Sequence, residues 1–345
     1  MEPCAARHSK PLLSLIADIG ATNARFAMVS PEAGLERVRV LTCEDYPSIH
    51  GAIAAYLDDE LPQTDVRRLH AAALAVAGPV TDDRVALTNH PWSFSIGQLR
   101  GHLAIDRLIV VNDFAAVAAA IPYLPTDGRT QVGAGEASSA APIGVLGPGS
   151  GLGVGGLVPT SGGWLPLPGE GGHATMAPAN ARESAVLDRM RARFDHVSAE
   201  RILSGPGLIH LYNTLAEIDG VAATSYAATQ ITDPDTCARE PRCREAVDIF
   251  CAMLGTVAGN LALTLGASGG IYVAGGIVPK LGPAFAASAF RERFESKGRL
   301  RPYLARIPTY VVTHPLPAFL GLAGLLGHLA SRGTLTETTA PRERS

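Results

Sequence analysis

The segment Leu108–Pro122 (LIVVNDFAAVAAAIP) constrains the fold of this chain more than any other stretch. Its four leading apolar residues predict a buried strand, and Phe114–Ile121 predicts a helix that the following proline helps to end. Asn112 and Asp113 then follow the strand directly, where open α/β sheets bind ligands. A carboxylate beside an amide suits removal of a proton from a bound hydroxyl, whereas the alternative is that Asp113 merely caps the helix.

The chain is long enough for two domains, with 345 residues of which 47% are hydrophobic and 18% charged. A net charge of −3 offers no electrostatic case for binding nucleic acid or an anionic membrane. Met1–Pro11 has no apolar core and does not resemble a signal peptide. We expect no apolar run of the roughly 18 residues that span a bilayer. These features predict a cytoplasmic protein that is not bound to a membrane.

The cysteines are odd in number and scattered along the chain, which favours reduced thiols. Cys237 and Cys243 are close enough in sequence to pair or to hold a metal ion. Their spacing is not C-x2-C, however, and no nearby histidine completes a ligand set. We therefore expect ordinary loop cysteines.

The segment Leu12–Val29 predicts a hairpin whose turn contains Gly20 and Ala21. Small side chains leave the backbone N–H groups of this turn open to an anion, and Thr22 and Arg25 add a hydroxyl and a positive charge. Asp18 is negatively charged, as phosphate is, so its position beside this turn makes sense if a hydrated magnesium ion bridges the carboxylate and the phosphates. The alternative is a plain hairpin, because D-x-G turns are common.

A second glycine-rich segment, Ile143–Leu157, predicts another phosphate-binding hairpin. It lacks the Gly-Lys-Ser/Thr of a Walker loop, and no helix clearly follows it as in a Rossmann fingerprint. Glycines at this density indicate close approach of backbone and ligand, and Ser150 adds a hydroxyl at the tip. The two hairpins therefore look like equivalent parts of two related halves.

Glu170 and His173 lie among glycines that make a metal-binding helix improbable. A carboxylate and an imidazole suit sugar hydroxyls, and the alternative is a structural turn. Glu200 is expected at a helix start with Ser198 as N-cap, where a glutamate can also be only a partner of the helix dipole. Gly275 and Gly276 follow a predicted strand and leave room for a flat ring system.

Further elements are predicted from the periodicity of apolar residues and from the glycines and prolines that mark turns. Trp92 is expected to pack a domain edge, in a loop where Asn89 can alternatively face a ligand. The remaining expectations are helices at Pro47–Leu61, Arg244–Leu265 and Pro317–Ser331, strands at Ala71–Val76 and Gly270–Ala274, a turn at Ser204–Gly207 leading into a helix, and a mobile tail at Gly333–Ser345.

Taken together and in order, these motifs resemble the bacterial glucokinase family of the hexokinase and actin-like ATPase superfamily. The resemblance extends from about Leu12 to about Leu329, and it is to the non-ROK type, because the cysteine-rich zinc motif of ROK sugar kinases is missing. The motifs are DIGATNAR, NHPWSFS, VNDF, GPGSGLGV, LPGEGGH, AERILSGPGL and GGIYVAGGIVPK.

The resemblance implies an α/β protein with a two-domain actin-like ATPase (ribonuclease H-like) fold and an interdomain cleft. A small domain would comprise residues 1–123, rejoined by the helix 317–331, and a large domain would comprise residues 124–315. ATP-dependent phosphorylation of D-glucose at the 6-position, the entry step of glycolysis, would be the activity, with ATP and Mg²⁺ as cofactors and a homodimer as the assembly.

The resemblance also implies a role for each motif residue. Asp113 would be the general base, and Asn112, Glu170, His173 and Glu200 would hold the other glucose hydroxyls. The residues that would contact ATP are Ala17, Asp18, Ile19, Gly20, Ala21 and Thr22 in the first loop, Gly147, Gly149, Ser150, Gly151 and Gly153 in the second, and Gly275 and Gly276 near adenosine. Asp18 would also hold Mg²⁺ through water. Ala21 stands where a second glycine is usual, and Ser150 where threonine is usual.

Three other kinds of function compete with this one. A non-catalytic sugar sensor is possible on the same fold, because fold alone does not decide function. A DNA-binding regulator would need a basic helix-turn-helix segment at the N-terminus, and Met1–Pro11 is too short to form one. A filament-forming or chaperone-like ATPase would not need Asn112, Glu170, His173 and Glu200 around a polyol.

Overall fold

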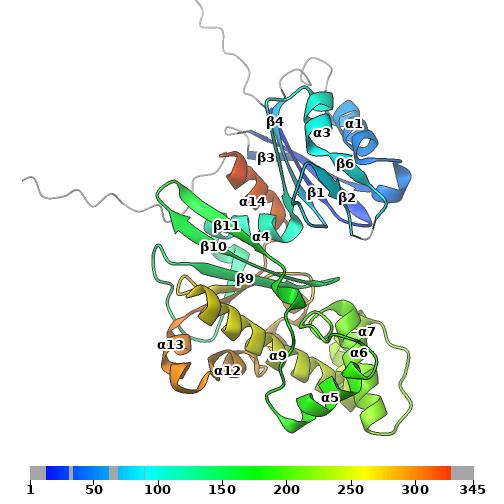
Figure 1. Ribbon diagram of the computed structural model, residues 1–345, viewed down its shortest axis with the longest axis vertical. Helices are drawn as coiled ribbons and strands as arrows, with labels where there is room; N and C mark the ends of the chain where they lie inside the picture. Colours follow the sequence, from blue (N-terminus) through cyan, green and yellow to red (C-terminus); the bar gives the residue numbers. More distant parts are fainter. Residues whose placement is uncertain (1–12, 31–33, 62–68, 89, 328–345) are drawn as a thin grey trace, which may run out of the picture. The chain divides into compact units, whose positions relative to one another are not determined.

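The computed structural model of the chain describes residues 13–30, 34–61, 69–88 and 90–327, which form two compact units (Figure 1). Unit 1 contains the described residues up to Tyr123 and those from Leu316 onward, and unit 2 contains Leu124–Pro315. The chain thus leaves unit 1 once and returns to it at the end. Asn89, Met1–Pro11 and the segment Gly333–Ser345 lie outside the described residues.

A mixed sheet with strand order β3-β2-β1-β4-β7 forms the centre of unit 1. β1 and β2 form an antiparallel hairpin, whereas β1, β4 and β7 run parallel to one another. The strands are β1 (Leu13–Ile19), β2 (Asn23–Ser30), β3 (Gly34–Thr42), β4 (Leu69–Val76) and β7 (Arg107–Asn112). A small separate ribbon pairs β5 (Arg84–Ala86) with β6 (Ser93–Ser95).

Helices cover both faces of this sheet, because alternate residues of its strands are apolar on both sides. One face packs with α1 (Ile49–Glu60) and α3 (Ile96–Leu103), and Trp92, 4% exposed, joins the same cluster. The other face packs with α4 (Asp113–Ala120) and α14 (Pro317–Leu326). Short 3₁₀ turns follow at Cys43–Asp45 and Ile121–Tyr123.

The contact between α4 and α14 requires a glycine at its centre. A Cβ at Gly321 would lie 1.8 Å from the carbonyl oxygen of Ala116, so any larger residue would force the two helices apart. Phe319 and Leu322 of α14 are buried in the same cluster as Ile16 of β1. The C-terminal helix is therefore part of the core of unit 1 (Figure 1).

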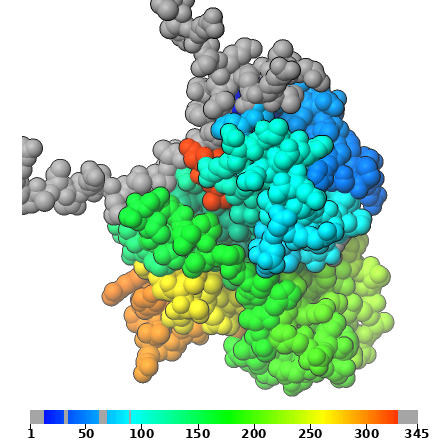
Figure 2. Space-filling view, turned by 45° about the horizontal axis from the view of Figure 1, so that its top comes forward, coloured from blue at the N-terminus to red at the C-terminus, as the bar shows by residue number. Residues whose placement is uncertain are grey.

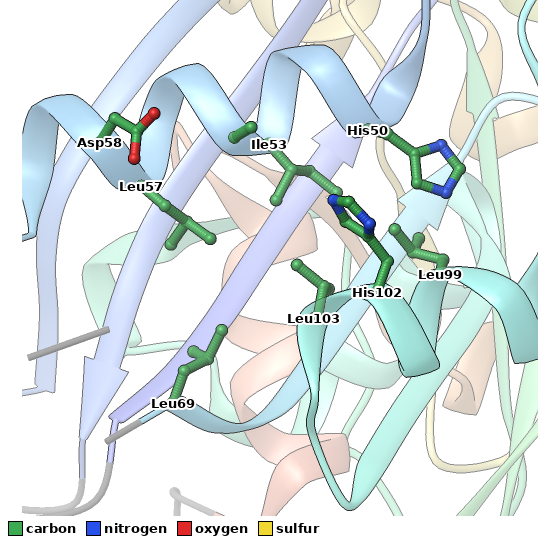
Figure 3. A pocket seen from close by; sticks show the side chains of 9 residues that line it. His50, Ile53, Leu57, Asp58, Leu69, Leu99, His102 and Leu103 are labelled. Atoms are coloured by element: carbon green, nitrogen blue, oxygen red, sulfur yellow. The ribbon is translucent and has the colours of Figure 1, made fainter. Parts of the chain in front are cut away.

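A small cavity of about 170 Å³ lies between α1 and α3 in unit 1 (Figure 3). Leucine and isoleucine side chains form most of its wall, including Leu57 and Leu99. The rings of His50 and His102 meet at its end, edge to face, with centroids 5.5 Å apart. Burial and the neighbouring His102 lower the pKa of His50.

Unit 2 repeats the strand arrangement of unit 1. Its sheet has the order β11-β10-β9-β12-β13-β8, in which β9 and β10 form the antiparallel hairpin and β12 and β13 continue parallel to β9. The edge strand β8 is antiparallel to β13. The strands are β8 (Arg129–Val132), β9 (Ile143–Pro148), β10 (Leu152–Thr160), β11 (Gly163–Gly169), β12 (Ile271–Val273) and β13 (Thr309–Val312).

Helices bury one face of this sheet in a single large apolar cluster. The main helices are α5 (Ala181–Arg191), α6 (Gly205–Ile218), α9 (Pro241–Leu265) and α12 (Phe290–Glu295). Shorter helices are α7 (Ala228–Ile231), α8 (Pro234–Arg239), α10 (Val278–Leu281), α11 (Pro283–Ala286) and α13 (Arg301–Arg306). Turns of 3₁₀ type lie at Thr126–Gly128, Gly171–His173 and Gly298–Leu300.

Helix α9 differs from the expectation that no apolar run is long enough to span a bilayer. Its mean hydropathy reaches 1.7 over 18 residues, and by length and composition it could cross a membrane. Of that window, however, 61% is buried within the protein, where α9 packs against α6 and α12. Core packing accounts for its apolar character.

Most elements predicted from the sequence are confirmed, including both glycine hairpins, the strand and helix at Leu108–Pro122 and the long helix α9. Three details were wrong. Glu200 lies in a turn rather than at a helix start, because the helix begins at Gly205 with Ser204 as its N-cap. The turn expected at Ser204–Gly207 is therefore already the first turn of α6. The last helix ends at Leu326, where Gly327 adopts a left-handed conformation with φ of 85°.

Candidate active site

Three parallel strands of unit 1 end in the same row of the sheet. Ile19 of β1 is in register with Val76 of β4, and Val76 is in register with Asn112 of β7. Neighbouring strands lie about 4.8 Å apart, so the ends of β1 and β7 are separated by roughly 10 Å. The first glycine turn and the Asn112–Asp113 pair therefore share one edge of the sheet.

The first predicted phosphate loop is a tight turn between β1 and β2. The Gly20 N–H donates to the Asn23 carbonyl at 3.0 Å, and Thr22 is exposed at the tip. Ala17 and Ile19 are buried and anchor the strand, whereas Gly20 and Ala21 are partly open. The open residues are those of the turn itself, as an anion-binding hairpin requires.

Asp18 faces Arg25 across this hairpin, and the Arg25 Nη1 donates to its Oδ2 at 3.1 Å. Burial of the Asp18 side chain, which is 22% exposed, raises the pKa of its carboxyl, and the charge of Arg25 partly opposes that rise. Arg25 thus contacts a carboxylate in this structure, although the sequence suggested that it faces phosphate.

The Asn112 side chain caps α4. Its Oδ1 accepts from the N–H groups of Phe114 and Ala115 at 2.8 and 3.3 Å, and its Nδ2 donates to the Gly78 carbonyl at 3.2 Å. Asp113 is the first residue of the helix, with one carboxylate oxygen accepting from the Phe114 N–H at 2.7 Å. The N-cap role that was the alternative for Asp113 thus belongs to Asn112.

The second glycine hairpin lies at the corresponding edge of the sheet in unit 2. Leu146 of β9 is in register with Val273 of β12, so the loop after β9 and Gly275 after β12 end side by side. A Cβ at Gly275 would lie 2.4 Å from the Pro148 carbonyl oxygen, and its φ is +84°. Gly276 has open space instead, which leaves room for a ligand.

Within the second loop, exposure rises toward the tip. Gly147 is buried in β9, Gly149, Gly151 and Gly153 are partly exposed, and Ser150 is exposed. The Gly149 N–H donates to the Gly151 carbonyl at 2.8 Å and closes the turn. The Ser150 hydroxyl is thereby presented at the tip.

Unit 2 brings Glu170, His173 and Glu200 together. Glu170 and His173 flank the 3₁₀ turn Gly171–His173 after β11, and the Glu200 N–H donates to the Gly172 carbonyl at 2.9 Å. The His173 Nε2 lies 4.0 Å from Glu200 Oε1, and both side chains are open to solvent, at 62% and 32% exposed. The His173 imidazole beside the Glu200 carboxylate can bind more than one hydroxyl, and the exposed Glu170 lies three residues before His173 in the chain.

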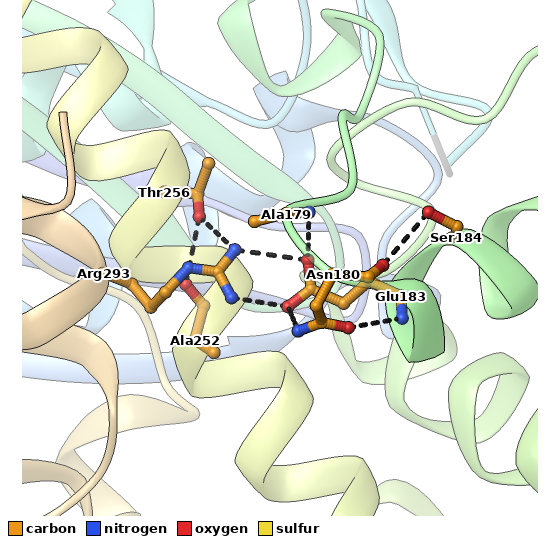
Figure 4. A network of polar contacts seen from close by, with 7 residues as sticks. All are labelled: Ala179, Asn180, Glu183, Ser184, Ala252, Thr256 and Arg293. Atoms are coloured by element: carbon orange, nitrogen blue, oxygen red, sulfur yellow. Dashed lines mark hydrogen bonds and ion pairs between the residues drawn. The ribbon is translucent and has the colours of Figure 1, made fainter. Parts of the chain in front are cut away.

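A buried ion pair that the sequence analysis missed fixes the segment after His173 (Figure 4). Glu183 is 1% exposed, and its carboxylate accepts from both terminal nitrogens of Arg293 and from the Ala179 N–H at 2.7 Å. Arg293 also donates to the Thr256 hydroxyl of α9 at 2.8 Å. The signal was present in the sequence as Asn180-x-x-Glu183, a capping pattern before a helix.

A magnesium ion would find few protein ligands here. No group of three or more His, Cys, Asp or Glu able to hold a metal occurs among the residues that the structure describes. Cys237 and Cys243 are both free thiols, but the expectation that they lie in a loop was wrong: Cys237 lies in α8, and Cys243 lies in α9, buried in the core cluster. Asp18 alone, at a phosphate loop, fits a magnesium ion held by one carboxylate, waters and phosphates.

These features define a class of protein. Two sheets of the same strand order, each with a glycine hairpin at its ligand-binding edge, are the architecture of a kinase with the actin-like ATPase fold. A crystal structure of glucokinase from an Antarctic psychrotroph has the same fold, with a TM-score of 0.82 and 36% identity over 92% of this chain and 99% of that one.

The Glucokinase family model matches residues 15–328, and the chain belongs to the glucokinase family. It is 50% identical to the glucokinase of Paramagnetospirillum magneticum (strain AMB-1) over 313 residues, 90% of this chain and 97% of that protein. It is 47% identical over 330 residues to the "Bifunctional protein glk" of Paraburkholderia xenovorans (strain LB400), covering 96% of this chain and about half, 51%, of that longer protein.

Proposed function

We propose that the chain transfers the γ-phosphoryl group of ATP to the 6-hydroxyl of D-glucose and that Asp113 is the general base. The observation that carries this proposal is the row formed by Ile19, Val76 and Asn112. That row puts a carboxylate roughly two strand spacings from a phosphate-binding turn, which is room for a transferring phosphoryl group.

In this proposal each polar side chain has one task. Asp113 accepts the proton of the 6-hydroxyl as that oxygen attacks phosphorus, which is the step in which a general base acts. Asn112, Glu170, His173 and Glu200 bind the remaining hydroxyls and orient the sugar. Because the Asn112 Oδ1 is occupied by α4, its Nδ2 is the group that donates to the sugar.

The nucleotide is held mainly by backbone N–H groups. Those of Gly20–Thr22 and of the loop Gly147–Gly153 bind the phosphates, the Ser150 hydroxyl adds a donor, and Gly276 lies against adenosine beside Gly275. Asp18 holds a magnesium ion through water, and that ion supplies charge neutralisation of the phosphates when bound. The protein's own contribution is orientation of the nucleotide and exclusion of water.

A coupled assay for glucose 6-phosphate with Mg-ATP tests the proposal, with mannose, fructose and N-acetylglucosamine as competing sugars. Selective turnover of glucose is expected, and Asp113→Ala should lose about 10²–10⁴ in kcat while still binding glucose by calorimetry. Near-normal turnover by Asp113→Ala would refute the assignment of the base. Binding of glucose by the unmodified protein without any turnover would instead favour a sugar sensor.

We also propose that the protein acts as a homodimer in the cytoplasm. Free thiols at all four described cysteines, Cys43, Cys237, Cys243 and Cys251, support a reducing compartment. Sedimentation at micromolar concentration tests the dimer, and a mass of one chain, 35.9 kDa, would contradict it.

A further inference from the structure

The segment from Ala199 to Gly205 connects the sugar-binding turn to the second phosphate loop, and we call it the bridging segment. On one side the Ala199 N–H donates to the Ala174 carbonyl at 2.8 Å, beside the bond from the Glu200 N–H to Gly172. On the other side the Gly205 N–H donates to the Gly149 carbonyl at 2.8 Å. The bridging segment is thus hydrogen-bonded to both groups of ligand-binding residues.

The side chain of Glu200 makes the same connection. Its Oε2 accepts from the N–H of Leu152, a residue of the second phosphate loop, at 2.8 Å, while Oε1 faces the imidazole of His173 at 4.0 Å. A Cβ at Gly151 would lie 2.5 Å from Oε2. Only glycine at position 151 therefore leaves this carboxylate where it is.

The backbone of Glu200, which connects the sugar-binding turn to the second phosphate loop, is held in a fixed position. The Ser204 hydroxyl donates to the Glu200 carbonyl at 2.8 Å and accepts from the Gly207 N–H at 3.0 Å, so the turn is tied to the start of α6. Ser204 is 3% exposed, and its neighbours Ile202 and Leu203 are fully buried. The Glu200 backbone therefore stays in place, and a displaced carboxylate moves by rotation of its own side chain and loses its bond to the Leu152 N–H.

We propose that Glu200 is a positioning residue for the second phosphate loop as well as a sugar ligand, so that it couples nucleotide binding to sugar binding within unit 2. This inference rests on the proposed function. A sugar hydroxyl that binds to the Glu200 carboxylate alters the strength of its bond to Leu152, and hence the shape of the loop Gly147–Gly153. By linkage, the nucleotide changes sugar affinity by the same factor.

Calorimetric titration of Mg-AMPPNP without any sugar separates the two roles of Glu200. Glu200→Ala is expected to lower nucleotide affinity about tenfold, because it removes a charge-assisted hydrogen bond to the loop. Glu200→Gln should restore part of that affinity, since its amide oxygen still accepts from Leu152. The matched control is His173→Ala, which faces the same sugar site without touching the loop and should lower only glucose affinity.

A reciprocal pair of variants tests the coupling from the side of the loop. Gly151→Ala displaces the Glu200 carboxylate and should weaken glucose binding in the absence of nucleotide, whereas Gly162→Ala, in the turn between β10 and β11 and outside the site, should leave glucose affinity unchanged. Unaltered nucleotide affinity in Glu200→Ala together with unaltered glucose affinity in Gly151→Ala would overturn the inference alone. Failure of the unmodified protein to bind either ligand would overturn the proposed function with it.

Discussion

Asp18 and Arg25 are directly opposite each other in the β1–β2 hairpin, with the guanidinium 3.1 Å from the carboxylate. The pair lies one residue before the first phosphate turn. Its two members are the nearest fixed charges to that turn on its own hairpin, and they have opposite sign. In the proposed function, the balance between them therefore sets the charge that a nucleotide would meet at this turn.

Removal of Arg25 should raise the pKa of the Asp18 carboxyl further. Burial already raises it, and Arg25 is the group that lowers it by charge and hydrogen bonding, so Arg25→Gln leaves burial unopposed. The change can be followed by carboxyl-carbon NMR of the protein free of nucleotide and metal. Arg39→Gln, which removes a similar arginine from exposed Asp59, is the control. An unchanged pKa in Arg25→Gln would mean that the ion pair is not formed in solution.

Asn112 should prove to have separable structural and ligand-binding roles. Asn112→Ala deletes the N-cap of α4 and is expected to reduce the free energy of unfolding by about 1 kcal/mol, whereas Asn112→Ser keeps an N-cap oxygen and most of the stability. Both variants remove the side-chain amide and should bind glucose more weakly. Urea unfolding combined with glucose titration measures the two effects, and normal glucose affinity in both would exclude the amide as a sugar ligand.

The buried pair of Glu183 and Arg293 should be far more sensitive to substitution than surface pairs. Arg293→Met leaves the Glu183 carboxylate buried and unpaired, which is expected to cost about 3–5 kcal/mol of stability. Arg39→Met breaks a pair whose side chains are 39% and 56% exposed, and should cost less than about 1 kcal/mol. Denaturant unfolding of the two variants compares them, and equal losses would show that burial of Glu183 does not matter.

Acidification should destabilise unit 1 through His50. Its pKa is lowered by burial and by His102, so the unfolded chain takes up a proton more readily than the folded protein. The contribution of neutral His50 to stability is complete above pH 6.5, its ordinary pKa, and is lost as the pH falls through the lowered value. Chemical unfolding between pH 7.5 and 5 should show a shallower decline for His50→Asn, whose amide does not titrate. His70→Asn, outside the cavity of Figure 3, is the control.

The sequence is sufficient to predict the hairpins and the strand-polar-helix segment because each depends on local pattern. The pattern of apolar residues and the glycines that mark turns predict that Asp18 and Asp113 lie at strand ends. Parallel strands bring their carboxyl ends to the same edge of a sheet. Ser204 shows the limit of this reasoning. Both Ser198 and Ser204 are suitable N-cap residues, but the segment after Ser198 forms a turn that is bonded to distant residues, with Ala199 bonded to Ala174 and Glu200 to Gly172 and Leu152.

Long-range partners were not predictable for a different reason. Glu183 and Arg293 are 110 positions apart, and no periodicity in either segment indicates the other. The same holds for Gly321, whose lack of a side chain lets the backbone of Ala116, on a helix far away in the sequence, approach closely. Such pairs arise from packing that the order of residues alone does not specify.

The return of the last helix to unit 1 has a consequence for synthesis of the protein. A ribosome releases β1, β4 and α4 first, yet the sheet face that contains Ile16 and Ala73 is covered in part by α4 and is completed by Phe319 and Leu322 of α14. All of unit 2 is translated in between. The nascent chain must therefore keep part of one apolar face of its first sheet uncovered until α14 has been synthesised, and premature termination before α14 would yield a chain unable to complete that core.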